Sequence, residues 1–104
     1  MNDRTLLELA ARAAGIDPVL AEPINFSTGV EYYWNPRDDD GDALRLAVKL
    51  RLDISVEREI QVSWWQGESL ETVTWPLGDD PYAAARYAIV RAAAEVGKSM
   101  GGGE

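Results

Sequence analysis

The chain of 104 residues contains no cysteine and no histidine. Without cysteine it can form neither a disulfide nor a thiolate-ligated zinc site. Without histidine it lacks the side chain that most often acts as a general base near neutral pH and as a metal ligand. Serine–histidine triads and histidine-based zinc or iron centres are therefore excluded. A single domain of this length can bury enough apolar surface to fold without such staples.

Long apolar runs and clusters of basic residues are missing as well. No stretch approaches the about 18 consecutive apolar residues that a membrane helix needs, and the first residues lack the basic leader and apolar block of a signal peptide. We therefore expect a cytoplasmic protein that does not enter a membrane. The 18 acidic and 10 basic residues give a net charge of −8, and the basic residues are scattered. Direct binding to nucleic-acid phosphates is not expected.

Apolar residues spaced three and four positions apart predict three helices. They are expected over residues 3–14, from Asp40 or Asp42 to about Arg51, and from Pro81 to Gly97. Asp80 fits the N-cap of the third helix, and the glycines at 15 and 97 fit helix ends. On the third helix, the same spacing predicts an apolar face of Tyr82, Ala85, Ile89, Ala92 or Ala93, and Val96.

Between the second and third helices the apolar period changes to two, which predicts strands. These strands are expected over residues 52–56, 60–65 and 72–75, with a hairpin turn at 66–69. The fold class is thus α+β: a small α/β sandwich with an antiparallel sheet of about three strands packed by two to three helices. The expected order is helix, loop, helix, strands, helix. Residues 1–97 should form one globular domain and 98–104 a flexible tail; periodicity leaves open whether helices cover one sheet face or both.

The stretch "RDDDGD" at residues 37–42 has the composition of a calcium loop. An EF-hand loop with Gly41 at its sixth position would have Pro36 first and Ala47 last, and neither supplies a carboxylate. The aspartates fit instead as an N-cap and as acids in the first turn of a helix. The glycines at 101–103 follow a helix, unlike a phosphate loop. No metal and no cofactor are predicted.

Large aromatic side chains make up the candidate partner surface, which consists of Tyr32, Tyr33, Trp34, Trp64 and Trp65. Successive strand residues point to opposite faces, so one of the two adjacent tryptophans should be exposed or covered at an edge. Exposed rings of this size are typical anchors for protein partners. The alternative is that residues 32–34 fold over the outward ring and bury it. This surface or a sheet edge is also a candidate for homodimer formation.

The strand region is acidic, with five acids and one base between Leu52 and Trp75. A candidate acidic face consists of Asp53, Glu57, Glu59 and Glu71. Such a face would fit a decoy that imitates nucleic acid and inhibits a host defence protein. Convergence of glutamates 57, 59, 68 and 71 would instead fit a carboxylate-based hydrolase, although no second catalytic motif accompanies them.

Four phrases together resemble small proteins encoded by phages and prophages of proteobacteria, the phage ABA sandwich domain family: "LLELAARAAGI", "YWNP", "DDGDALRLAVKL" and "DPYAAARYAIVRAAAEVGKSM". The resemblance implies an α/β sandwich and a prophage origin. The family has no assigned activity and no established functional residues, so no site carries over. Its pattern often has leucine and threonine or serine where Arg37 and Asp38 stand here, which argues against a ligand role for Asp38.

The primary hypothesis is a non-enzymatic phage or prophage accessory protein. It would act in the bacterial cytoplasm through contact with a host or phage protein whose identity the sequence does not give. The acidic decoy is the alternative, and the carboxylate-based hydrolase is a remote one.

Overall fold

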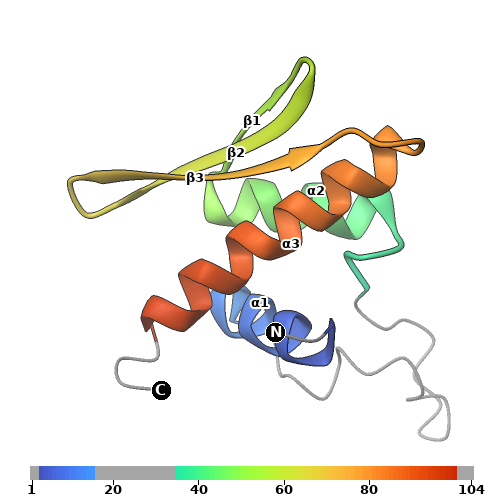
Figure 1. Cartoon of the computed structure of the whole chain (residues 1–104). Coiled ribbons are helices and arrows are strands. Elements are labelled where there is room, and N and C mark those ends of the chain that lie inside the picture. Colours follow the sequence, from blue (N-terminus) through green and yellow to red (C-terminus); the bar gives the residue numbers. More distant parts are fainter. Residues whose placement is uncertain (1–2, 16–34, 101–104) are drawn as a thin grey trace, which may run out of the picture.

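A computed structural model of the chain describes residues 3–15 and 35–100. Its elements follow the predicted order (Figure 1): α1 (Asp3–Ala14), α2 (Asp40–Leu50), β1 (Asp53–Val56), β2 (Glu59–Gln66), β3 (Ser69–Pro76) and α3 (Pro81–Met100). The α+β class and the three-stranded antiparallel sheet are confirmed.

The sheet has the strand order β1-β2-β3, so β2 lies in the centre and pairs antiparallel with both neighbours. Val62 on β2 lies opposite Ile54 on β1 and Val73 on β3, which aligns three apolar side chains on one face. The predicted hairpin turn is confirmed, because Gln66 pairs with Ser69 across a two-residue loop. Gly67 in that loop has a φ of +65°, a conformation that glycine adopts without strain.

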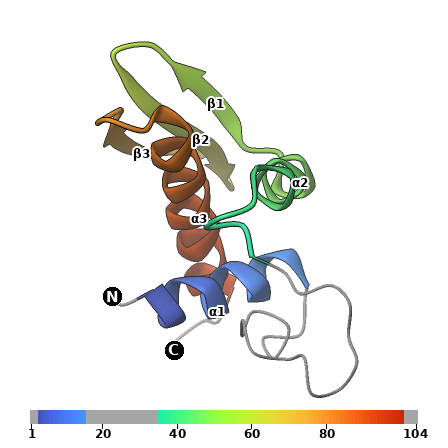
Figure 2. The same ribbon diagram turned by 90° about the vertical axis from the view of Figure 1, so that its right-hand side faces the viewer.

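All three described helices lie on the same side of the sheet. In Figures 1 and 2, α3 lies beneath the strands, α2 lies beside α3, and α1 crosses α3 on the side away from the sheet. Leu6 of α1, Leu46 of α2, Val62 of β2 and Val90 of α3 belong to the one hydrophobic core that results. The other sheet face, called the outer face below, has no described helix on it.

The helix α3 is the centre of the packing, and its small residues allow this. Alanines 84, 88, 92, 93 and 94 are all buried, so α3 contacts the sheet, α1 and α2 with different sides. The predicted apolar face is wrong at Tyr82, which is exposed, whereas Tyr87 is partly buried against the core. A helix surrounded on several sides has no single apolar stripe, and period counting then misplaces its face.

The predicted end of the third helix at Gly97 is also wrong, because α3 continues to Met100. A Cβ atom at Gly97 would collide with the backbone carbonyl of Leu9, so this glycine permits the close approach of α1 and α3. The Gln66 side-chain amide donates to Ser99 Oγ at 2.9 Å, and Ser99 Oγ donates to the Val96 carbonyl at 3.0 Å. Residues 98–100 of the predicted tail are therefore helical, and residues 101–104 lie outside the described residues.

Candidate protein-interaction surface

The aspartates before α2 act as a helix start, as expected. Asp39 is the N-cap, and its Oδ1 accepts from the Gly41 backbone N–H at 2.9 Å. The Asn35 side-chain amide donates to Asp38 at 3.1 Å, and the Asn35 backbone N–H donates to buried Asp42 at 2.9 Å. These short bonds fold the stretch onto the positive end of the helix dipole.

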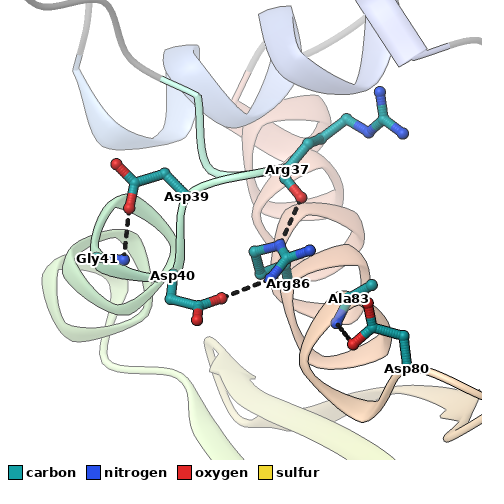
Figure 3. A network of polar contacts seen from close by, with 7 residues as sticks. All are labelled: Arg37, Asp39, Asp40, Gly41, Asp80, Ala83 and Arg86. Atoms are coloured by element: carbon teal, nitrogen blue, oxygen red, sulfur yellow. Dashed lines mark hydrogen bonds and ion pairs between the residues drawn. The ribbon is translucent and has the colours of Figure 1, made fainter.

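The remaining aspartate of the stretch, Asp40, connects two parts of the chain through Arg86 (Figure 3). Arg86 Nη1 donates to Asp40 Oδ1 at 2.6 Å, and Arg86 Nε donates to the Arg37 carbonyl at 2.7 Å. The Arg86 side chain is only 17% exposed. On the same helix, Asp80 accepts from the Ala83 N–H at 3.1 Å, which confirms the predicted N-cap. The two Arg86 bonds thus connect α3 with the start of α2, whereas the Asp39 and Asp80 bonds in Figure 3 each cap one helix.

The other candidate carboxylates are distributed over different parts of the sheet. Within residues 3–15 and 35–100, no group of three or more acidic residues is placed to hold a metal ion. Asp53 and Glu59 lie on the outer face, Glu57 lies between β1 and β2, and Glu71 lies opposite buried Trp64. The period of two gives Glu71 the same side of the sheet as Trp64, so the four carboxylates of the predicted acidic face do not share one face.

The four glutamates of the hydrolase hypothesis do not all come together. Glu57 and Glu59 border one hollow of about 210 Å³ at the turn before β2, whereas Glu68 lies in the loop after the end of β2. The eight residues of β2 separate these positions by roughly 25 Å. Neither Glu57 nor Glu59 can therefore act on the same bond as Glu68.

The two adjacent tryptophans of β2 have opposite environments, as the alternation predicts. Trp64 is 7% exposed and belongs to the core, whereas Trp65 is 68% exposed. Trp65 pairs directly with Leu70 of β3, which is 56% exposed. Tyr32, Tyr33 and Trp34 lie outside the described residues, so their part in the predicted surface stays a prediction.

The outer face therefore consists of an apolar end and a polar middle. We call the Trp65–Leu70 pair the outer patch. Next to it, Ser63 and Thr72 are paired across the strands, and their hydroxyl oxygens are 3.1 Å apart in a hydrogen bond. Because the side chains of Ser63 and Thr72 are short, this part of the surface would lose little side-chain conformational entropy on binding a partner.

Sequence reasoning missed the aromatic pair on the helix side of β3. The rings of Trp75 and Tyr87 have centroids 4.5 Å apart and are tilted by 53°. Trp75 borders two hollows, one of about 400 Å³ between β3 and α3 and one of about 380 Å³ that reaches Arg37. The alternation of Val73 and Trp75 with Thr72 and Thr74 predicts this side of the sheet for Trp75, but no sequence pattern indicates its contact with Tyr87.

Comparisons with protein-family models, with curated proteins and with solved structures give no match. Among the described helices, none is long and apolar enough to cross a membrane. Function has to be inferred from the chain's own surfaces, and the outer patch contains Trp65, one of the residues of the predicted partner surface.

Proposed function

We propose that this protein is a non-enzymatic accessory protein of phage or prophage origin that binds another protein through the outer patch. It acts in the cytoplasm of the bacterial host. The observation that carries this proposal is the direct pairing of Trp65 and Leu70, both more than half exposed, on the sheet face that no described helix covers.

The energetics favour a protein ligand for this patch. Tryptophan is among the residues most enriched where binding energy concentrates in protein interfaces, because its large surface is desolvated at little entropic cost. Its truncation at such a site typically costs about 2 kcal/mol or more, which is roughly a thirtyfold loss in affinity. The polar residues beside the patch suit the rim of an interface.

Charge defines the kind of partner. The chain carries a net charge of −8, and Asp53 and Glu59 lie on the same face as the patch. A complementary partner has an apolar centre bordered by basic side chains, which would accelerate association at low salt. The separated carboxylates described above give no comparable support to an acidic decoy.

A photo-cross-linking residue at Thr72, next to the patch, tests the proposal in host cells. We expect it to attach one protein, other than a second copy of this chain, reproducibly. In the same chain, Trp65→Thr with Leu70→Thr should abolish that adduct. Val48→Thr on α2 is the matched control, because Val48 is also 68% exposed, and it should leave the adduct unchanged.

Two results would overturn the proposal. One is an adduct with that other protein that persists when both patch residues are replaced. The other is an adduct that Val48→Thr removes as effectively as the patch substitutions do. Circular dichroism of each variant establishes that the fold is retained.

A further inference from the structure

The strand β3 is an edge strand whose free side is long and regular. It has eight residues, and each of them pairs with β2 in one continuous register without a bulge. Its other side has no strand partner among the described residues. The opposite edge is formed by β1, which has only four residues.

The composition of β3 gives little protection against pairing. Its sequence, SLETVTWP, contains one charged residue, Glu71, and no lysine. Natural edge strands are commonly blocked by lysines, prolines or bulges. Here the only proline is Pro76, at the strand's end, and the middle consists of Thr72, Val73 and Thr74, which favour extended structure.

We propose that two copies of this chain pair antiparallel along β3, with the two-fold axis at Val73, to form one continuous six-stranded sheet. Gln66 and Ser69 flank a two-residue loop. In such a loop the two flanking residues form both backbone N–H···O=C hydrogen bonds with each other. Alternation along the ladder then directs the backbone N–H and C=O of Leu70, Thr72 and Thr74 to the free side. These are the groups that the second copy would bind.

The side chains select the register. Residues directly opposite each other in the pair of strands point to the same face of the sheet. The helices of both copies therefore lie on the same face of the six-stranded sheet only if the two-fold axis passes through a residue and not between two residues. An axis at Val73 places Thr72 opposite the partner's Thr74, and Leu70 opposite the partner's Pro76. Pro76 has no N–H to donate to the second copy, and it is the last residue of β3, where the pairing between the two copies would end.

Electrostatic repulsion between the two Glu71 carboxylates favours an axis at Val73 over an axis at Thr72. With the axis at Val73, the two Glu71 side chains are four positions apart, roughly 13 Å, which exceeds the Debye length of about 8 Å at physiological salt. An axis at Thr72 would bring them within two positions, roughly 7 Å. The Val73 axis also places the partner's Glu71 opposite Trp75, on the side of the sheet where the hollow with Arg91 lies.

The net charge of the chain predicts how dimer formation depends on salt. Both copies carry a net charge of −8, so they repel each other at long range, while the contact itself consists of backbone hydrogen bonds and uncharged side chains. Added salt should therefore strengthen self-association. Binding driven by opposite charges would weaken under the same change.

The absence of native cysteine permits a direct test of the register. In the Val73→Cys chain, the two cysteines would face each other at a non-hydrogen-bonded pair, where Cα atoms are about 4.5 Å apart, within the range of disulfides. We expect mild oxidation to give a covalent dimer in at least a tenfold larger fraction than in the Val56→Cys chain. Val56 is the matched control because it lies at the other edge of the sheet and is exposed.

Sedimentation of the unmodified chain supplies the second measurement. We expect a dimer whose population rises with salt, and a monomer for the chain with Thr72→Lys and Thr74→Lys, which would place like charges opposite each other. Both threonines are exposed, so the fold should persist. A monomeric unmodified chain without preferential cross-linking at Val73 would overturn the proposal. So would attachment of a different protein at that cysteine, which would make β3 a site for a foreign strand.

Discussion

Arg86 shows how a single side chain can connect parts of this chain that are far apart in sequence. Its two bonds join positions 46 and 49 residues away, and the one to the Arg37 backbone carbonyl is partly buried. The helix caps Asp39 and Asp80 could be predicted because a cap is set within three residues of itself. The Arg86 bonds could not, because no local pattern records which distant carbonyl an arginine will meet.

We expect Arg86→Ala to lower the free energy of unfolding by about 2–3 kcal/mol, since it removes two charge-assisted hydrogen bonds from a largely buried position. Arg86→Lys should recover only part of this loss, because an ammonium cannot reproduce the fork of the guanidinium. Urea denaturation followed by circular dichroism measures both. Arg58→Ala, in an exposed turn, is the control and should change stability by less than about 0.5 kcal/mol. Equal effects at the two arginines would contradict the assigned role.

Among the elements, α3 differs most from its prediction. A glycine after a run of apolar residues usually ends a helix, and Gly15 does so after α1. Gly97 also follows a run of apolar residues, but the helix continues past it. Here glycine is required because a side chain would collide with the backbone of Leu9. Only the position of α1, far away in the sequence, distinguishes the two cases.

Replacement of Gly97 by alanine tests this interpretation with opposite expected signs. If the residue only ended a helix or lay exposed within it, alanine would raise stability by up to about 1 kcal/mol. Because a Cβ atom would collide with the Leu9 carbonyl, we expect a net loss of about 2 kcal/mol. Lys98→Ala on the neighbouring exposed position should be nearly neutral. Thermal denaturation of the two variants measures the difference, and a stabilised Gly97→Ala chain would refute the close approach.

At the scale of the whole molecule, the helices on one side leave the sheet with two unlike faces. Part of this was available from the sequence, because Ser55, Gln61 and Thr72 alternate with apolar residues, as in a sheet with one face in water. Which helix would lie in the centre was not available. The alanines of α3 indicate a helix that can lie close to the sheet, but they do not indicate that α1 and α2 pack against it as well.

The unlike faces predict unequal access to the two adjacent tryptophans. Acrylamide, an uncharged quencher, should quench the fluorescence of Trp65 far more than that of Trp64. We expect Trp65→Phe to reduce the easily quenched component and Trp64→Phe to leave it unchanged. Each variant retains the other tryptophans of the chain, which makes the comparison direct. An unchanged component in the Trp65→Phe chain would show that this ring is covered in solution.

The distance of Leu70 from Val73 along β3 has a consequence for valency. Pairing across an axis at Val73 would put two copies of the outer patch on one continuous face, six positions or roughly 20 Å apart. The assembly would then match targets that are themselves symmetric, because engagement of one patch raises the effective concentration of the second to the millimolar range. A weak contact at each tryptophan could add up to tight binding through avidity alone.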